Sequence, residues 1–338
     1  MPVSAFICGC AGPILTDWER RFFQEAQPWG LILFKRNVDN PVQLAELTSS
    51  FREAVGRADA PVLIDQEGGR VQRLGPPHWP VYPSAASYLL IAGEVEPAAK
   101  LVHLTAQLMA NDLLAVGINV DCLPVLDVTY PDSHPVIGDR AYGSDPAAIA
   151  RLGRAAADGL LAAGVLPVMK HMPGHGRALA DSHLELPVVG ASRADLEASD
   201  FAPFIANADL PIGMSAHVVY PVLDPEGPAT SSAMVIQEII RKTIGFDGLL
   251  LSDDLSMQAL SGTLRERAEA ALGAGMDVVL HCNGNADEME TVAGGTPPLV
   301  GRARQRAEAA LARLRPPAAD FDPVDARARL NSALAMAV

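Results

Sequence analysis

The stretch of the sequence richest in reactive groups is KHMPGHGRALADSHLEL, from Lys170 to Leu186. It holds three histidines, a lysine, an arginine and Asp181, and the apolar run AAGVLPVM leads directly into it. Histidine has an ordinary pKa of about 6.5 and can exchange a proton near neutral pH. A neighbouring aspartate can fix the imidazole tautomer and stabilise the imidazolium. The stretch therefore predicts acid–base chemistry at the end of a buried strand.

Carboxylates and arginines also follow two other apolar runs. Asp65, Glu67 and Arg73 lie in VLIDQEGGRVQRL, where an aspartate could accept hydrogen bonds from vicinal hydroxyls and an arginine could donate to them. Asp253 and Asp254 lie in SDDLSM, and because adjacent strand residues point to opposite faces, we expect only one of them to face a pocket. An aspartate there could be a nucleophile, a metal ligand or a helix N-cap.

The elements that must position these groups alternate between strands and helices. Eight apolar runs predict strands, several of them apolar throughout as in parallel sheets covered on both faces, at 4–9, 29–34, 61–66, 118–128, 165–171, 212–218, 248–254 and 277–283. Helical patterns lie at 17–27, 41–57, 97–115, 145–163, 193–206, 231–243, 264–274 and 302–315.

This alternation predicts an α/β fold with a parallel sheet, and eight strands favour a closed (β/α)8 TIM-type barrel. No G-x-G-x-x-G follows the first strand, which weakens the dinucleotide-binding alternative. We expect a single catalytic barrel domain over residues 1–338, with a short helical tail from about 316 to 338. In such barrels the strand carboxyl ends form the active site, where the polar groups above would meet.

The composition of the chain excludes some classes of binding partner and indicates a cellular compartment. The formal net charge is −14 over 338 residues, which argues against nucleic acid or an anionic membrane surface. No basic residue precedes the first short apolar run, and no apolar run is long enough to span a membrane. The four cysteines, Cys8, Cys10, Cys122 and Cys282, form no C-x-x-C pair and indicate buried thiols in a reducing compartment. We expect a cytoplasmic protein.

Metal binding is an alternative for the histidines. His171, His175, His183 and His217 with Asp253 could form a ligand set for a metal-dependent barrel amidohydrolase. The adjacent Lys170 would repel a cation, however, and no H-x-H pair lies on the first strand. We therefore expect no metal site.

Taken together, the motifs resemble a known family. LILFKRN, DQEGGRVQRL, PVLDV, IGDRAYGSDP, KHMPGHGRALADSHLELP, SAHVVYP and GLLLSDDLSM occur in the order found in glycoside hydrolase family 3. They look most like its bacterial single-domain β-N-acetylhexosaminidases of peptidoglycan recycling. The resemblance spans about residues 29–283, and Met172 departs from it, since relatives commonly carry Phe there.

The resemblance implies roles for individual residues. Asp253 matches the nucleophile, His183 an unusual histidine acid/base and Asp181 its carboxylate partner. The sugar-binding positions match Asp65, Arg73, Arg140, Lys170 and His171. The tripeptide DSH occurs twice, and the context of the second copy favours His183 over His134.

The resemblance also implies an activity. It is an exo-acting, retaining β-N-acetylglucosaminidase that removes terminal N-acetylglucosamine from muropeptides, namely GlcNAc-1,6-anhydroMurNAc with or without peptide. The reaction would pass through a covalent glycosyl-aspartate and need no cofactor. We expect a monomer with a small saccharide substrate and no nucleic-acid or membrane partner. A β-N-acetylglucosaminide phosphorylase using the same site remains an alternative, since a neutral histidine base does not repel phosphate.

Overall fold

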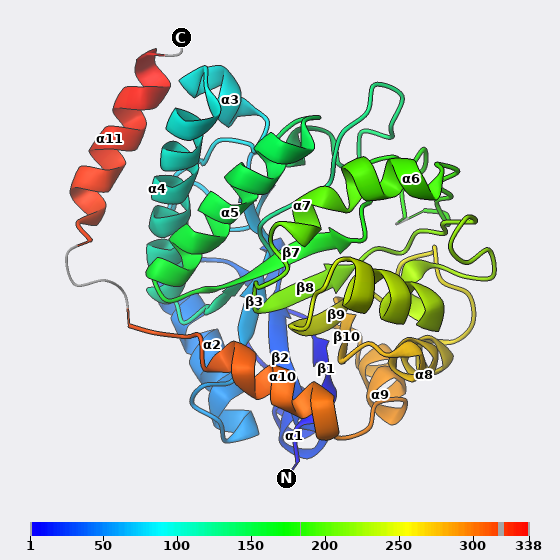
Figure 1. Cartoon of the computed structure of the whole chain (residues 1–338). Helices are drawn as coiled ribbons and strands as arrows, with labels where there is room; N and C mark the ends of the chain where they lie inside the picture. The colour runs from blue at the N-terminus through cyan, green and yellow to red at the C-terminus, as the bar shows by residue number, and fades with distance from the viewer. Residues whose placement is uncertain (1, 183, 317–320, 337–338) are drawn as a thin grey trace.

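Figure 1 shows a computed structural model of the chain, which describes residues 2–182, 184–316 and 321–336. Within these residues, eight parallel strands close a barrel in the order β1-β10-β9-β8-β7-β6-β3-β2. Their bounds are β1 Ser4–Cys8, β2 Pro28–Leu33, β3 Val62–Ile64, β6 Val120–Asp121, β7 Leu166–Met172, β8 Ile212–Ser215, β9 Leu249–Asp254 and β10 Val278–His281. The predicted (β/α)8 barrel is therefore confirmed.

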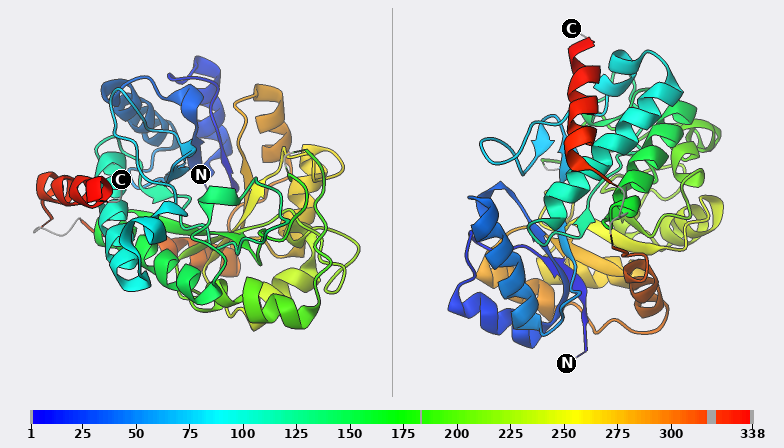
Figure 2. Two further views of the ribbon diagram at one scale, coloured as in Figure 1. Left: turned by 90° about the horizontal axis from the view of Figure 1, so that it is seen from above. Right: turned by 90° about the vertical axis from the view of Figure 1, so that its left-hand side faces the viewer.

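Helices surround the barrel (Figures 1 and 2). The α-helices are α1 Asp17–Ala26, α2 Pro41–Val55, α3 Ser87–Ala92, α4 Val95–Leu114, α5 Pro146–Ala162, α6 Arg193–Asp195, α7 Ala202–Ile205, α8 Leu264–Ala274, α9 Ala286–Gly294, α10 Gly301–Leu311 and α11 Pro323–Met336. Short 3₁₀ turns are η1 Lys35–Asn37, η2 Gly138–Arg140 and η4 Ala229–Ser231, and π-helical segments are η3 Leu196–Asp200 and η5 Val235–Thr243. Among the described helices, none combines the length and apolar content needed to cross a membrane.

Some local elements differ from those predicted. The run 118–128 contains only the two-residue strand β6, and Pro124, which has no N–H to donate, lies in the irregular part that follows. An antiparallel hairpin, β4 Gln66–Gly68 and β5 Val71–Gln72, follows β3 and was not predicted. Helices α3 and α9 were not predicted either.

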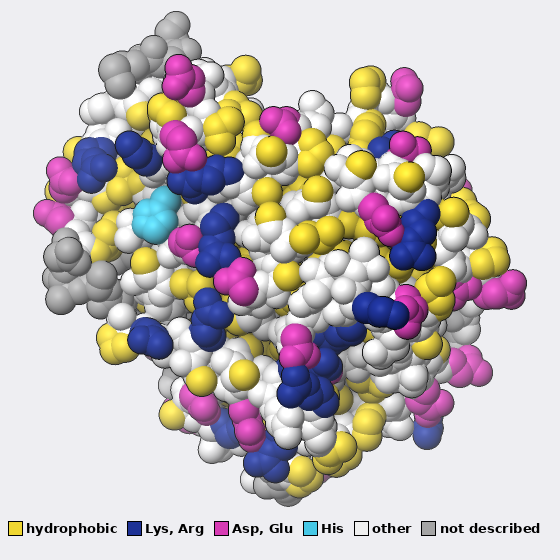
Figure 3. All heavy atoms as spheres, in the orientation of Figure 1, with side chains coloured by type: hydrophobic (Ala, Val, Ile, Leu, Met, Phe, Trp, Pro, Cys, Tyr) yellow, Lys and Arg dark blue, Asp and Glu magenta, His cyan; other side chains and the backbone are white. Residues whose placement is uncertain are grey.

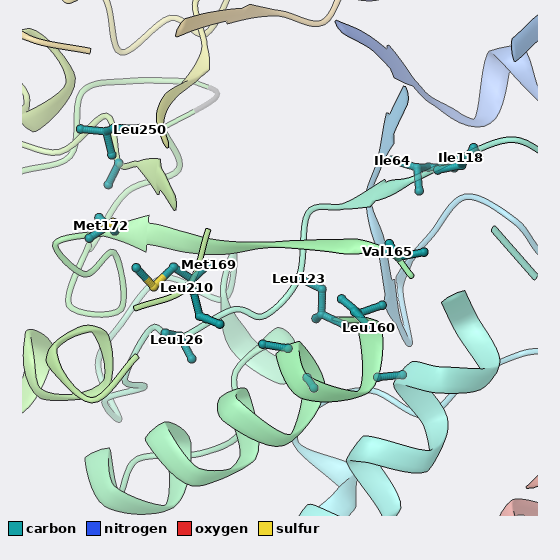
Figure 4. Close-up of a cluster of buried hydrophobic side chains, with 14 of the residues drawn as sticks. Ile64, Ile118, Leu123, Leu126, Leu160, Val165, Met169, Met172, Leu210 and Leu250 are labelled. Atoms are coloured by element: carbon teal, nitrogen blue, oxygen red, sulfur yellow. The ribbon is translucent and has the colours of Figure 1, made fainter. Parts of the chain in front are cut away.

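Two apolar clusters hold the barrel together. One cluster fills the barrel interior with side chains from the eight strands. Ala307 and Ala310 of α10 close it at the end where the strands begin. The other lies between strands and helices, as Figure 4 shows around Val165 and Met169. Strand β7 contributes to both, because its side chains alternate: Val168 points inward and Met169 outward. The same alternation directs the next residue, Lys170, toward the mouth of the barrel.

Candidate active site

A cavity of about 450 Å³ opens at the carboxyl ends of the barrel strands. This is the end at which barrel enzymes carry their active sites. Seven residues predicted from the sequence line it: Asp65, Arg73, Arg140, Lys170, His171, Asp181 and Asp253. The predicted acid/base, His183, lies outside the described residues, whereas its neighbours Asp181 and Ser182 reach the cavity. The structure thus brings together every described member of the predicted set.

Lys170 occupies the centre of an ion-pair network. Its Nζ lies 2.9 Å from Asp65 Oδ1 and 2.6 Å from Glu67 Oε1. Arg73 Nη2 donates to Asp65 Oδ2 at 3.0 Å. Arg140 donates from both Nε and Nη2 to the two oxygens of Glu67, at 2.8 and 2.9 Å. Three cations therefore surround two carboxylates, and the geometry of each carboxylate is fixed from two sides.

The network keeps its members charged despite burial. Burial alone would raise the pKa of Asp65, but the charges of Lys170 and Arg73 outweigh it and hold this pKa well below its usual range. Glu67 follows the same pattern, with Lys170 and Arg140 lowering its pKa against the effect of burial. Burial would lower the pKa of Lys170, but Asp65 and Glu67 raise it above its usual range. At neutral pH the cavity therefore offers fixed charges to hydroxyl groups.

Arg73 has a second contact that sets its position. Its guanidinium lies 5.3 Å from the centre of the Phe34 ring, and the guanidinium of Arg36 lies 5.0 Å from the same ring. All three side chains line the cavity. Cation–π contacts of this kind hold a planar guanidinium against an aromatic face. The edge of the cavity formed by the segment after β2 is therefore cationic.

Asp127 holds two histidines that line the cavity, His171 and His175. Its Oδ2 lies 2.7 Å from His171 Nδ1, and its Oδ1 accepts from the backbone N–H of His175 at 2.7 Å. Asp127 is fully buried, yet these histidines keep its pKa below the usual range against the effect of burial. A carboxylate acceptor places the proton of His171 on Nδ1 and leaves Nε2 as the nitrogen that can contact a ligand.

His175 links this pair to the loop that carries the predicted acid/base. Its Nε2 lies 3.2 Å from the hydroxyl of Ser182. Burial, together with the neighbouring His171, lowers the pKa of His175 to about 4, so the ring is neutral at pH 7. Ser182 in turn accepts the backbone N–H of Ala259 on its carbonyl at 3.3 Å. The segment next to His183 is thereby held against the cavity wall.

Asp253 and Asp254 both line the cavity, so the expectation that only one would face it is wrong. The pairing of β9 with β10 is irregular between Leu251 and Asp254, and such irregularities change where side chains point. The two carboxylates are used differently. Asp254 accepts from the N–H and hydroxyl of Ser256, at 3.0 and 2.5 Å, and from the N–H of Cys282 at 3.0 Å. It therefore fixes the loop but caps no helix, because the next described helix, α8, has Thr263 as its N-cap. Asp253 accepts from the N–H of Asp254 at 2.8 Å.

The other DSH copy lies elsewhere. His134 Nδ1 accepts from the backbone N–H of Val136 at 3.1 Å, and the Val136 carbonyl accepts from Arg140 Nη1 at 3.3 Å. His134 is not among the described residues that line the cavity. It thus contacts the loop that carries Arg140.

Three groups that matter to the site were not predicted in the contacts they make: Asp127 was assigned no role from the sequence, Glu67 was only an alternative acid/base, and His175 only a candidate metal ligand. Each follows an apolar run, which was the available signal, but their pairing depends on which strands are neighbours in the barrel. Across the described ranges there is no group of three or more His, Cys, Asp or Glu residues arranged to hold a metal ion.

Comparisons with known proteins agree with this geometry. Residues 16–310 match the N-terminal domain of glycosyl hydrolase family 3. A β-hexosaminidase of Bordetella avium is 39% identical over 318 residues, covering 90% of this chain and 88% of that protein. A β-hexosaminidase of Alkalilimnicola ehrlichii is 41% identical over 291 residues, covering 84% and 82%. NagZ of Neisseria gonorrhoeae, crystallised with N-trifluoroacetyl-D-glucosamine, has a TM-score of 0.84 and 31% identity, covering 100% of this chain and 98% of that one.

The barrel, its cavity and these matches define an enzyme of the glycoside hydrolase class. The chain belongs to glycosyl hydrolase family 3. The resemblance to the family's β-N-acetylhexosaminidase branch is confirmed, and with it the predicted enzyme class. The comparisons favour this class over the metal-dependent amidohydrolase that the histidines had left open.

Proposed function

We propose that the chain is an exo-acting, retaining β-N-acetylglucosaminidase that releases terminal N-acetylglucosamine from GlcNAc-1,6-anhydroMurNAc, with or without peptide. The observation that carries the proposal is the common cavity lined by Asp253, Asp181 and the five predicted sugar-binding residues. The relative NagZ was crystallised with an N-acylated glucosamine, which supports a site of this chemistry here. We further propose that the chain acts as one catalytic domain, as a monomer in the cytoplasm.

The first step forms a glycosyl-enzyme. A carboxylate oxygen of Asp253 bonds to the anomeric carbon while the glycosidic C–O bond breaks, and His183 gives its proton to the leaving oxygen. Asp181 accepts from the imidazole and stabilises its protonated form. The network of Lys170, Asp65 and Arg73 binds the sugar hydroxyls through charge-assisted hydrogen bonds.

The second step releases the sugar. His183, now neutral, takes a proton from water, and the water oxygen bonds to the anomeric carbon as the bond to Asp253 breaks. Two displacements at one carbon return the β configuration. Histidine suits this role near neutral pH because its ordinary pKa lies close to the working range.

Hydrolysis of 4-nitrophenyl β-N-acetylglucosaminide beside the matching β-glucoside tests the proposal. We expect turnover of the first and little of the second, and free N-acetylglucosamine of β configuration as the first product by NMR. The reaction is then repeated with inorganic phosphate. A sugar 1-phosphate product would support the phosphorylase instead, and activity on the β-glucoside alone would contradict the assigned substrate.

A further inference from the structure

The C-terminal helix α11 lies beyond residues 16–310, the part of the chain that matches the family domain. It packs along α3 and α4, as Figures 1 and 2 show for the red helix at the end of the chain. Ala326 and Leu330 of α11 are buried in the outer apolar cluster. Between them, Arg327 makes polar contacts with the body of the barrel. Helix α11 therefore contacts the barrel through both apolar and polar side chains.

Arg327, Tyr82 and Asp112 form a cluster between three segments. Arg327 Nη2 donates to the Tyr82 hydroxyl at 2.7 Å and lies 3.4 Å from Asp112 Oδ2, while its guanidinium lies 4.9 Å from the Tyr82 ring centre. The Tyr82 hydroxyl donates to Asp112 Oδ2 at 2.6 Å. Burial, and next the charge of Asp112, raise the pKa of Tyr82, so the hydroxyl stays protonated. Asp112 belongs to α4, so the cluster joins α11, α4 and the segment around Tyr82.

Tyr82 is also bonded through its backbone to the β4–β5 hairpin. Its N–H donates to Gln72 Oε1 at 2.9 Å, and its carbonyl accepts from Gly69 N–H at 2.9 Å. The approach is close: a Cβ at Gly68, where φ is +90°, would lie 2.2 Å from the Pro83 carbonyl oxygen. The hairpin therefore rests directly on the segment that contains Tyr82.

The hairpin ends at Arg73, whose guanidinium lines the cavity. Gln72 Nε2 donates to the Leu74 carbonyl at 2.7 Å, and the backbone N–H of Arg73 donates to Gln66 Oε1 at 3.0 Å. The residues on both sides of Arg73 are thus held by the same network that Tyr82 joins. A chain of hydrogen bonds therefore connects Tyr82, through Gln72, to the backbone on either side of Arg73.

We propose that Arg327 is a positioning residue of the active site: through Tyr82 and the β4–β5 hairpin it fixes Arg73 in its sugar-binding position. The proposal rests on the proposed function, because Arg73 is expected to bind the substrate. It gives the helix outside the family domain a part in substrate affinity. Because Arg73 is expected to bind the sugar equally in the ground state and in the transition state, the effect falls on KM rather than on kcat.

Steady-state hydrolysis of 4-nitrophenyl β-N-acetylglucosaminide tests the proposal with Arg327→Met. We expect KM to rise roughly threefold to tenfold with kcat nearly unchanged, the size expected when the hydrogen bonds of Arg73 to the sugar are weakened rather than lost. The matched control is Arg329→Met, because Arg329 is exposed on the same helix and its ion pair, to Asp325, stays within α11. Tyr82→Phe, which keeps the ring but removes the hydroxyl, should shift KM in the same direction and serves if Arg327→Met does not fold.

The same change in an Arg73→Ala background identifies the route. If Arg327 acts through Arg73, Arg327→Met should hardly alter kcat/KM once Arg73 is gone; additive losses would overturn the proposal. Hydrogen–deuterium exchange of residues 66–84 gives a reading that needs no turnover. We expect faster exchange in Arg327→Met than in Arg329→Met, and equal exchange would also overturn the proposal. If the wild-type protein did not hydrolyse the substrate, the proposed function would be refuted. The exchange comparison between Arg327→Met and Arg329→Met would still test whether Arg327 holds the hairpin.

Discussion

The ammonium of Lys170, at the end of β7, lies 2.9 Å from the carboxylate of Asp65, which follows β3. The two residues are 105 positions apart, and in the barrel β6 lies between their strands. The contact therefore depends on the strand order β7-β6-β3 rather than on proximity along the chain. Because Lys170 also pairs with Glu67, one buried cation connects the end of β7 with the segment from β3 to β4 and with the charges that we propose bind the sugar.

Lys170→Met should destabilise the protein and abolish hydrolysis. The Lys170 side chain is only 2% exposed, and its loss leaves Asp65 and Glu67 facing each other without their shared cation. Breaking a buried pair in this way costs about 3–5 kcal/mol of unfolding free energy, measurable by urea denaturation. Lys242→Met is the control, since that lysine is 75% exposed and pairs with Glu238 one turn away, which is worth about 0.3–0.5 kcal/mol. Equal urea midpoints for the two variants would contradict the central role of Lys170.

Asp253→Asn and Asp254→Asn should separate activity from stability. Asp253→Asn should lower turnover by at least about 10³-fold with little change in Tm, because it removes the proposed nucleophile. Asp254→Asn should retain more activity but lose about 1–3 kcal/mol, because the Asp254 carboxylate accepts from Ser256 and Cys282 and an amide replaces one acceptor. Trapping with a 2-fluoro or 5-fluoro sugar followed by peptide mapping identifies the labelled residue. A label on Asp254, or on no aspartate, would contradict the assignment.

Elements with strong local signals were predictable from the sequence. Helix α5 begins with Pro146 at its first position and Asp145 as its N-cap, and the prediction 145–163 differs from its observed bounds by one residue at each end. Strand β7 is apolar up to Lys170, as a strand buried on both faces should be. Helix α9 was missed because ADEMETVAG has a weak apolar pattern. Its N-cap, Asn285, accepts from Glu288 N–H and was a signal that could have revealed it.

The site was predictable in its members but not in its pairings. Strand ends identified Asp65, Lys170 and Asp253, because the carboxyl ends of parallel strands meet at one end of a barrel. That Arg140 pairs with Glu67 and Asp127 with His171 depends on distances between loops that no spacing along the chain encodes. The presence of both Asp253 and Asp254 in the cavity lining was not predicted, because simple alternation does not anticipate the irregular pairing of β9 with β10.

His175 should make the protein less stable in acid. Burial and His171 lower its pKa to about 4 against the opposing charges of Asp127 and Asp253, whereas the ordinary value is 6.5. Between these values the unfolded chain binds more protons than the folded one, so the free energy of unfolding falls as pH drops from 6.5 to 4. His175→Gln cannot titrate and can still bond Ser182. We expect it to lose about 1–3 kcal/mol less than the wild type across this window, by urea denaturation at each pH. If the free energies of unfolding of the wild type and of His175→Gln changed in parallel with pH, His175 would not titrate between pH 4 and pH 6.5.

His183→Ala and Glu67→Gln should differ in how they depend on the leaving group. Glu67 was the alternative acid/base, but its two oxygens bind Arg140 and Lys170, which hold its pKa below the usual range. A carboxylate held in this way does not donate a proton near pH 7. Glu67→Gln should therefore slow all substrates to a similar extent and destabilise the protein.

His183→Ala should slow glycosides with poor leaving groups by about 10²–10⁴-fold, because they need protonation in the transition state. Aryl glycosides with good leaving groups should form the glycosyl-enzyme with a smaller loss, since the phenolate departs without a proton. Loss of the glycosyl group should remain slow because the base is missing, and azide, which needs no deprotonation, should restore that step and yield a glycosyl azide. The measurement is kcat/KM against leaving-group pKa for both variants, with and without azide. A steep dependence in Glu67→Gln and a flat one in His183→Ala would assign the proton transfer to Glu67.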